Sequence, residues 1–447
     1  MNPEPTERLL RILDADHRAA LHLGGVPAAE LAARFGTPCY VYDAAILRQR
    51  ARLVARTLGV EVLFALKANP SLAVTAVLAG CGTGADVLSL GELLLARRAG
   101  VPPARIQFAG PGKTTEELTS AAEAGIAAIH VESAQELAAL EQVGSRLGRR
   151  VSVGLRLRPG TLAGGAEPPR LRIGGADQKF GVSRSEAIDL ARRVRESTTL
   201  QLVALHGYLG TQCFDARAWL GAADQLLDAA DAVERAAGAE LPMLNFGGGF
   251  AVGYFAGDGE LDLTAVGAGL RERLSGRPQR RAVVELGRYL TAPAGVYLTR
   301  VRYTKHEDSR RVAILDGGMH HHAAAAGLGA VLRRPFPIVA AHSPRTTETV
   351  RHALCGPLCT PLDELAAEAE LPELAPGDLL AVLGSGAYGM TFSHTMFSSH
   401  PTPAEVLVDG GQAFLIREPG CPTDAQRGQL LPAELAADAP RVDNPAP

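Results

Sequence analysis

Short apolar runs alternate with longer amphipathic segments over the first two thirds of the chain. Apolar runs of about four to eight residues are typical of buried strands, whereas apolar residues at every third or fourth position are typical of helices. The apolar runs are 62–66, 84–88, 105–109, 127–131, 151–157, 201–207, 243–246 and 282–285. Helical patterns separate most of them, at 73–79, 91–99, 116–124, 134–147, 184–195, 216–237 and 263–274. Such alternation within about 250 residues predicts an α/β fold with a (β/α)8 barrel, and a doubly wound open sheet is the alternative.

The pattern changes after Arg288. The segments there alternate apolar and polar residues, which is typical of strands with one solvated face. They are 294–304, 311–315, 379–382, 404–408 and 412–417, with Gly410 and Gly411 as a hairpin turn between the last two. The sequence therefore predicts a second and mostly antiparallel β domain after a barrel over 43–290. Short amphipathic helices are expected within 8–35, Asp43 is the expected N-cap of a helix over 44–58, and the tail 421–447 is expected to be mobile.

Composition and charge mainly exclude functions. The formal net charge is −3, from 45 basic and 48 acidic residues, which argues against nucleic acid or an anionic membrane as a partner. The six cysteines are spread along the chain and predict reduced thiols in a cytoplasmic protein, not a disulfide framework or a zinc site. The first residues are polar and acidic, unlike a signal peptide, and no apolar run reaches membrane-spanning length.

Polar side chains and glycines follow the carboxyl ends of the predicted strands, where barrel enzymes carry their active sites. Lys67 follows the first strand, Asp86 lies at the second, and Arg156 lies in the fifth. The later strands contribute His206, Tyr208, Thr211, Gly247, Gly248, Gly249, Glu285, Gly287 and Arg288. Because parallel strand ends meet at one face of a barrel, we expect these residues to cluster.

The chemistry of this set points to one cofactor. Lys67 lies in the stretch 61–69, just after the buried run, where a lysine ordinarily keeps its ammonium in water but, when desolvated with a lowered pKa, can form a Schiff base. The glycines at 247–249 suit close approach of the backbone to a phosphate, or are merely a tight turn. Glu285 could be a structural carboxylate, or could hold a pyridine nitrogen protonated. Together the three features describe a site for pyridoxal 5'-phosphate.

Ordered motifs carry a specific resemblance over roughly residues 35–418. The chain resembles the fold-type III pyridoxal-phosphate decarboxylases, the family of diaminopimelate and ornithine decarboxylases. The motifs are FALKAN at 64–69, GADVLSLGE at 84–92, KFG at 179–181, GTQ at 210–212, NFGGGF at 245–250, ELGR at 285–288, GPLC at 356–359, GAYG at 386–389 and PAEV at 403–406. The resemblance implies an alanine racemase-like barrel with a β-sandwich or barrel-like domain built from 1–42 and 291–420.

The resemblance also implies a role for each matching residue. Lys67 would bind the cofactor covalently, Glu285 would face the pyridine nitrogen, and Asp86 and Arg156 would support the ring. The phosphate would be surrounded by Thr211, Gly248, Gly249, Gly287 and Arg288, with Tyr388 reaching it from the second domain. Cys359 would come from the partner subunit of a head-to-tail homodimer and return a proton after carbon dioxide leaves. Without the resemblance, Cys359 would be interpreted as a small buried apolar residue.

Three positions depart from the family pattern. Tyr208 stands where a ring-stacking histidine is usual, with His206 two residues earlier, so both are candidates for contact with the cofactor. Glu-Leu-Gly-Arg replaces Glu-Pro-Gly-Arg at 285–288. Thr360 and Pro361 follow the cysteine, where the amino-acid decarboxylases carry an acid that holds the distal ammonium of the substrate.

The third departure shapes the expected function. We expect a decarboxylase that removes the α-carboxylate of an amino acid or amino-acid conjugate, similar to biosynthetic-cluster branches such as carrier-protein-tethered glutamyl decarboxylases and siderophore decarboxylases. The alternatives are a diaminopimelate decarboxylase of lysine biosynthesis, an amino-acid racemase or epimerase, and a regulator without cofactor. Glu285 argues against a racemase, and the retention of Lys67, the glycines and Cys359 argues against a regulator.

Two further features are candidates for substrate contact. His320, His321 and His322 follow the predicted strand at 311–315, and consecutive histidines rarely converge on one metal ion, so no metal site is predicted. Arg334 could bind a substrate carboxylate or the phosphopantetheine of a carrier, and Thr360 could contact the substrate beside Cys359. Arg334 could equally lie in a solvated loop.

Overall fold

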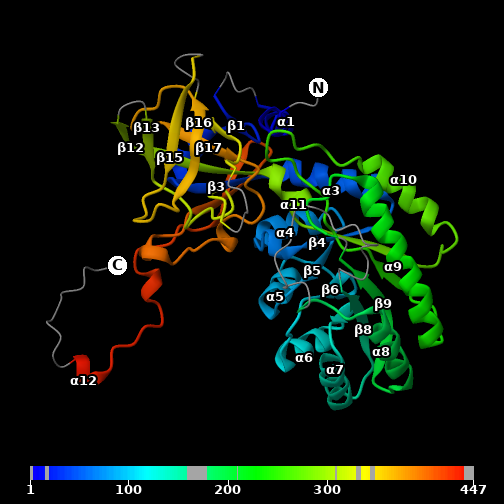
Figure 1. Ribbon diagram of the computed structural model, residues 1–447. Coiled ribbons are helices and arrows are strands. Elements are labelled where there is room, and N and C mark those ends of the chain that lie inside the picture. The colour runs from blue at the N-terminus through cyan, green and yellow to red at the C-terminus, as the bar shows by residue number, and fades with distance from the viewer. Residues whose placement is uncertain are drawn as a thin grey trace.

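A closed barrel of parallel strands forms the centre of the first domain (Figure 1). The computed structural model describes residues 4–15, 20–158, 179–208, 210–307, 310–328, 334–342 and 348–436. The barrel strands follow one another in chain order: β4 (Glu61–Ala65), β5 (Gly84–Val87), β6 (Ile106–Phe108), β7 (Ala128–Val131), β8 (Val151–Leu157), β9 (Leu200–Gly207), β10 (Met243–Asn245) and β11 (Arg281–Leu286). β11 pairs with β4 and closes the barrel, which confirms the (β/α)8 prediction over the open sheet.

Helices surround this barrel as an outer layer (Figure 1). They are α3 (Ala44–Leu58), α4 (Leu72–Ala79), α5 (Leu90–Arg98), α6 (Thr115–Ala124), α7 (Ala134–Leu147), α8 (Arg184–Glu196), α9 (Ala216–Ala237) and α10 (Leu263–Leu274). Capping side chains begin most of them. Asp43 accepts hydrogen bonds from the N–H groups of Ala45 and Ile46, as predicted, and Thr114 and Ser183 form capping boxes.

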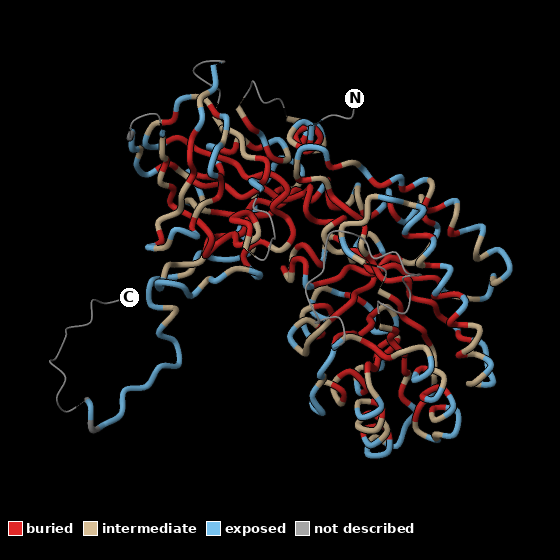
Figure 2. Tube along the Cα trace, viewed as in Figure 1, coloured by how far each residue is buried: buried red, intermediate tan, exposed pale blue. Residues whose placement is uncertain are grey.

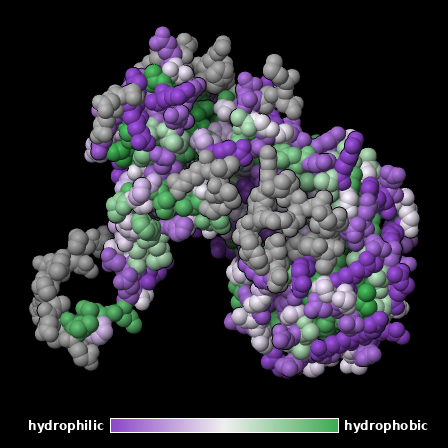
Figure 3. All heavy atoms as spheres, in the orientation of Figure 1, coloured by the Kyte–Doolittle hydropathy of each residue, from purple (hydrophilic) through white to green (hydrophobic). Residues whose placement is uncertain are grey.

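The core continues from the barrel into the second domain (Figure 2). A small cluster fills the barrel interior, and it consists of Leu63, Ala128, Ala204, Met243 and Val283. The outward-facing residues of the same strands pack against the helices, so the strands are buried on both faces. Figure 3 shows mainly hydrophilic residues on the outer surface of the barrel helices.

The second domain is a mostly antiparallel sheet. Its strands are β3 (Cys39–Asp43), β12 (Gly295–Glu307), β13 (Arg310–Leu315), β14 (Ile338–Ala340), β15 (Val350–Cys355), β16 (Glu364–Leu371), β17 (Leu379–Leu383), β18 (Ala404–Asp409) and β19 (Gln412–Arg417). The order is β16-β15-β13-β12-β3-β18-β19, with β17 also paired to β12 and to β14. β3 lies between β12 and β18, so the N-terminal strand does join this domain. Sequence patterns missed β14, β15 and β16.

The remaining elements lie at the two ends of the chain. α1 (Pro5–Ile12) and α2 (Ala28–Phe35) flank the short pair β1 (His22–Leu23) and β2 (Val26–Pro27). After β19 the chain leads away from the second domain to α12 (Ala433–Ala436), where apolar residues are visible in Figure 3. The last part of the predicted mobile tail, 437–447, lies outside the described residues. Within the described residues, no helix has the length and apolar character needed to cross a membrane.

Two hydrogen bonds join the domains beside the end of β4. Asn69 Nδ2 donates to the carbonyl of Gly386 at 3.0 Å, and the Tyr388 N–H donates to the carbonyl of Ala68 at 2.7 Å. A loop of the second domain is therefore held against the carboxyl end of the first barrel strand.

Candidate active site

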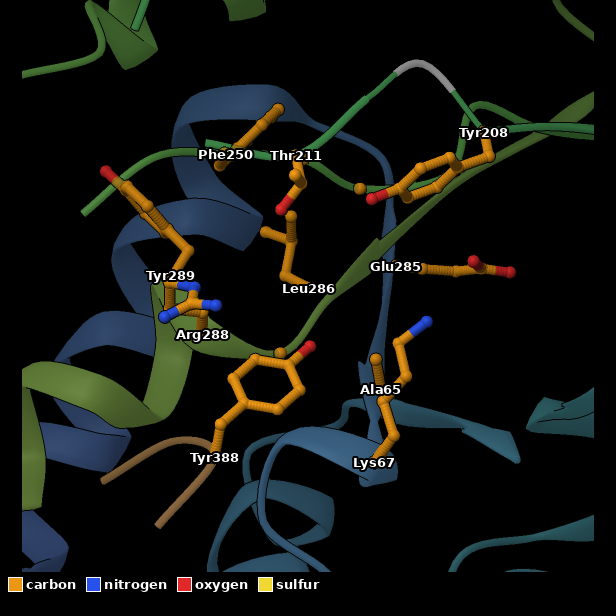
Figure 4. A pocket seen from close by; sticks show the side chains of 13 residues that line it. Ala65, Lys67, Tyr208, Thr211, Phe250, Glu285, Leu286, Arg288, Tyr289 and Tyr388 are labelled. Carbon is orange, nitrogen blue, oxygen red and sulfur yellow. The ribbon is translucent and has the colours of Figure 1, made fainter. Parts of the chain in front are cut away.

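A cavity opens at the carboxyl ends of β4, β9, β10 and β11 (Figure 4). The empty space along its wall, including space open to solvent, is about 480 Å³. The predicted residues on its wall are Lys67, Tyr208, Thr211, Gly248, Gly249, Glu285, Gly287, Arg288 and Tyr388. The other four residues on the wall had no predicted role, and they are Ala65, Phe250, Leu286 and Tyr289.

Lys67 projects into this cavity toward Glu285 (Figure 4). It lies on the turn Leu66–Ala68 that ends β4, and its side chain is accessible through the cavity although protein atoms surround it. Burial lowers the pKa of the amine, but Asp86, Tyr388 and Glu285 together outweigh burial, so the pKa is raised. The predicted lowering of the Lys67 pKa is therefore wrong, because these groups surround the ammonium.

Asp86 and Glu285 form a buried acidic pair beside Lys67. Burial raises the pKa of both carboxyl groups, and the Glu285 charge raises that of Asp86 further. Asp86 Oδ1 is buried and has no hydrogen-bond partner among the described residues. An unpaired buried carboxyl oxygen is costly, and it marks a position prepared for a group that the chain itself does not supply.

A layer of polar side chains lies under Glu285, and of its members only His206 was predicted. Asn245 Nδ2 donates to Glu285 Oε1 at 2.6 Å and to Gln107 Oε1 at 2.7 Å. Gln107 also contacts His130, and His206 Nε2 lies 3.3 Å from Glu285 Oε2. One signal was available in the sequence, because Gln107 and His130 interrupt otherwise apolar strands.

Gly248 and Gly249 form a backbone cradle that has no room for side chains. A Cβ on Gly248 would overlap the carbonyl oxygen of Glu285, and one on Gly249 would overlap the carbonyl oxygen of Gly210. Gly249 also has φ +92°, which strains any other residue. The Arg288 guanidinium lies beside this cradle, 4.6 Å from the ring centre of Tyr388 and 5.6 Å from that of Tyr254. The arrangement offers backbone N–H groups and one cation to an anion.

Several predicted residues do not line the cavity. Arg156 forms a buried ion pair with Glu132 at 2.7 Å, and His206 lies behind Glu285. Gly247 precedes the cradle and is not on the cavity wall, whereas Cys359 is exposed and Thr360 partly exposed on a turn of the second domain. Arg334 is exposed, with its guanidinium 4.1 Å from the ring centre of Phe255.

The three consecutive histidines are buried in the second domain. His321 Nε2 lies 2.8 Å from the carbonyl oxygen of Pro401, and His322 Nε2 lies 3.0 Å from Ser385 Oγ. Neither ring nitrogen of His320 has a partner among the described residues. Within the described part of the chain, the three histidines do not bring their ring nitrogens together with other possible metal ligands. Among the described residues, His130, His206 and Glu285 do so, with one possible ligand atom from each lying within 4.8 Å of the others.

Comparison with known proteins identifies this architecture. Residues 44–292 match the family model described as "Pyridoxal-dependent decarboxylase, pyridoxal binding domain". The chain belongs to this family. It is 34% identical to the L-glutamyl-(BtrI acyl-carrier protein) decarboxylase of Niallia circulans, with 92% of this chain and 97% of that protein covered. It is 37% identical to the diaminopimelate decarboxylase of Pseudomonas aeruginosa, with the same coverage of both chains.

Solved structures of decarboxylases agree with this assignment. The diaminopimelate decarboxylase of Helicobacter pylori, complexed with L-lysine, has a TM-score of 0.80 and 28% identity over 89% of this chain and 98% of that chain. The M. jannaschii enzyme, in co-complex with L-lysine, has a TM-score of 0.84 and 26% identity over 93% and 97% of the two chains. The protein is a pyridoxal-phosphate-dependent amino-acid decarboxylase.

The cavity of this decarboxylase fits its cofactor. On the cavity wall, the Lys67 amine, the Glu285 carboxyl group and the glycine cradle with the adjacent Arg288 match the aldehyde, pyridine nitrogen and phosphate of pyridoxal phosphate. The unpartnered Asp86 Oδ1 and the side-chain-free cradle are features of the apoprotein that a bound polar ligand would explain.

Proposed function

We propose that this decarboxylase acts on an amino acid presented as a conjugate, most simply a glutamyl group on a carrier protein. The observation that carries the proposal is the turn after Cys359, where an acid that could hold a second substrate ammonium is missing. Thr360 stands at that position. The relative from Niallia circulans, named for a glutamyl carrier-protein substrate, supports the same choice.

The geometry of the turn strengthens the argument from Thr360. Thr360 Oγ1 accepts a hydrogen bond from the Leu362 N–H at 3.3 Å, so the hydroxyl is engaged within its own turn. Asp363 is buried and accepts hydrogen bonds from the N–H groups of Met319 and Leu358. Glu364 lies 3.4 Å from Arg310. Both nearby carboxylates thus already have partners within the chain. An unpaired buried ammonium costs several kcal/mol, on the order of 3–5.

The residues of the cavity have distinct proposed roles. Lys67 supplies the amine that holds the cofactor covalently, and the glycine cradle, Thr211, Arg288 and Tyr388 bind the phosphate. Glu285 would hold the ring nitrogen, and Asp86 and Arg156 would adjust the charge of its carboxyl group. Pyridoxal phosphate, when bound, supplies a ring that accepts the electron pair left by the departing carboxylate. Cys359 would donate its thiol proton to the α-carbon of the substrate, which has lost the carboxylate, and would regain a proton from solvent.

We also propose that a second copy of the chain completes the site. Cys359 is exposed and absent from the cavity wall of its own chain, which supports a contribution of this thiol to the site of another subunit. Exposed apolar side chains lie near it in the sequence and near Tyr388, namely Leu362, Phe392, Met396 and Phe397. Exposed large apolar side chains are common at protein interfaces.

Arg334 is the proposed contact for an anionic part of the conjugate. Its guanidinium stacks on Phe255, next in sequence to Tyr254, which in turn contacts the cavity-lining Arg288. A cation at this position could pair with a carboxylate or with a phosphate of a carrier's prosthetic arm.

Decarboxylation of diaminopimelate is the second candidate. Relatives named diaminopimelate decarboxylase reach 37% identity, and the solved neighbours bind L-lysine. Glu285 and the family match disfavour a racemase, and the intact cavity disfavours a regulator without cofactor.

A substrate screen separates these candidates. Release of carbon dioxide would be compared for meso-diaminopimelate, ornithine, free glutamate and glutamyl carrier protein. We expect kcat/KM for the carrier-bound substrate to exceed that for diaminopimelate at least about a hundredfold, the effect of an unpaired polar group in a specific site. The matched variant Thr360→Glu should gain activity on the diamino acids. Robust turnover of meso-diaminopimelate by the unmodified enzyme would overturn the proposal.

A further inference from the structure

Asn245 lies at the end of β10, fully buried between the glycine cradle and Glu285. Its Oδ1 accepts a hydrogen bond from the Gly247 N–H at 2.8 Å, while its Nδ2 donates to Glu285 Oε1 at 2.6 Å. A backbone N–H can only donate, so the orientation of the amide is fixed. The Nδ2 group therefore acts only as a hydrogen-bond donor, and Glu285 Oε1 acts as the acceptor.

Gln107 holds this amide from below. Gln107 Nε2 faces Met243 Sδ at 3.1 Å, which leaves Oε1 to accept from Asn245 at 2.7 Å and from His130 Nε2 at 2.6 Å. His130 then carries its proton on Nε2, and burial holds its pKa well below the ordinary value. Gly154 leaves room for the imidazole, because a Cβ there would overlap Nδ1.

Glu285 Oε1 therefore accepts a hydrogen bond from Asn245 Nδ2, whose orientation is fixed. The charged and titratable groups around its carboxyl are Lys67, Asp86, Glu132, Arg156 and His206. Burial raises the pKa of Glu285, whereas Lys67, the Asn245 hydrogen bond and Arg156 lower it. Of the three residues that lower the Glu285 pKa, Asn245 is the uncharged one. It therefore favours the carboxylate form without adding a charge to the buried site.

We propose that Asn245 is a positioning residue that keeps Glu285 a hydrogen-bond acceptor and fixes its register to the glycine cradle. This inference rests on the proposed role of Glu285 at the ring nitrogen. One amide then sets the spacing between the groups that meet the two ends of the cofactor. Gly247 leads directly into the cradle at Gly248 and Gly249, and Glu285 Oε1 belongs to the carboxyl group on the cavity wall.

The first test is Asn245→Asp, which is nearly isosteric. One carboxylate oxygen still accepts from the Gly247 N–H, but the other faces Glu285 Oε1 and Gln107 Oε1 without a proton. We expect the Kd of the apoprotein for pyridoxal phosphate to rise at least tenfold. We also expect the pH midpoint of the visible absorption of the bound cofactor to move by about one unit or more. Thermal unfolding of the apoproteins checks that both fold.

The second test combines Asn245→Asp with Glu285→Gln. The amide introduced by Glu285→Gln can donate to the carboxylate introduced by Asn245→Asp, so the hydrogen bond is restored in the opposite direction. We expect Asn245→Asp to raise the Kd less than about threefold in this background, against at least tenfold with Glu285 present, which a double-mutant cycle measures. Equal effects in both backgrounds, or no effect in either, would overturn the inference.

The proposed function is tested separately in the same samples. Borohydride reduction followed by peptide mass analysis shows whether the cofactor is attached to Lys67. Absence of that link in the unmodified protein would contradict the proposed function. Its presence, together with an unchanged Kd and absorption midpoint for Asn245→Asp, would contradict only the role of Asn245.

Discussion

The charge of Lys67 is set by residues far away in the sequence. Asp86 on β5 contributes most, and Tyr388 and Glu285 add to it, so together they raise the pKa of an amine that burial alone would lower. From the sequence, only the position of Lys67 at a strand end was evident. The contribution of Asp86 could not be quantified, because it depends on the separation of groups on different strands.

Replacing Lys67 by alanine tests most directly whether this residue binds the cofactor covalently. Lys67→Ala removes the amine, so we expect no visible absorption from covalently bound cofactor and a loss of turnover of at least about a thousandfold, the scale expected when a covalent catalytic group is removed. Absorbance after gel filtration and carbon dioxide release measure the two effects. Colour and turnover that persist unchanged would contradict the assignment.

His320 gives a prediction about stability and pH. Its ring is buried against His321 and lies near His400 and Arg302, and burial lowers its pKa to about 3. The unfolded chain takes up this proton below about pH 6.5, so the stability contributed by the neutral ring is present above that pH and is lost toward pH 3. His320→Phe should therefore gain about 2 kcal/mol in stability relative to the unmodified protein between pH 7 and pH 5.

Chemical denaturation of the apoprotein at the two pH values measures this gain. His306→Asn, which replaces an exposed histidine on β12, is the control and should show no such dependence. The same relative stability of His320→Phe at both pH values would mean that the buried ring is protonated or solvated in the folded state.

At the scale of elements, the site is built from the ends of strands and from turns. The periodic patterns predicted α7, α9 and α10 to the residue, because side-chain direction along a helix is a local property. They missed β14 to β16, which are short or carry several charged residues, such as Glu364–Leu371. The pairing of such strands depends on neighbours elsewhere in the chain.

The glycine cradle offers a prediction at this scale. Gly248→Ala places a methyl group against the Glu285 carbonyl, so the loop after β10 has to move away from β11. We expect the Kd for pyridoxal phosphate to rise at least about tenfold, as a loss of about 1.4 kcal/mol or more. An absorbance titration of the apoprotein measures it.

Gly221→Ala is the matched control for this substitution. Gly221 lies within α9 and a Cβ there would meet nothing within 4 Å. This variant should keep its cofactor affinity and gain up to about 1 kcal/mol in the free energy of unfolding, the usual difference between glycine and alanine in a helix. Equal cofactor affinities for the two variants would contradict a steric role for Gly248.

At the scale of the whole molecule, two domains meet at one cavity. Tyr388 reaches the barrel with φ +54°, held by its hydrogen bond to Ala68. Cys359, on the same domain, does not reach the cavity of its own chain. The single chain therefore presents a binding site for the cofactor and, on another surface, the proposed proton donor.

Mixed subunits test whether two copies share the site. Lys67→Ala and Cys359→Ala chains should each be inactive alone. Random mixing in a head-to-tail dimer leaves one intact site in half of the dimers, so about a quarter of the unmodified activity should return. Co-refolded or co-expressed mixtures measure this, and activity no greater than that of the separate variants would contradict the shared site.

The sequence by itself determined the barrel, the second domain, the cofactor and most of the residues on the cavity wall. Strand and helix periods are local, and the order of strands in a (β/α)8 barrel brings their carboxyl ends together. Only the tertiary structure decided the charge of Lys67, the buried positions of His320 and His206, and the orientation of Asn245. These properties arise from groups on separate strands whose fields and hydrogen bonds act over a few ångströms, a separation that spacing along the chain does not encode.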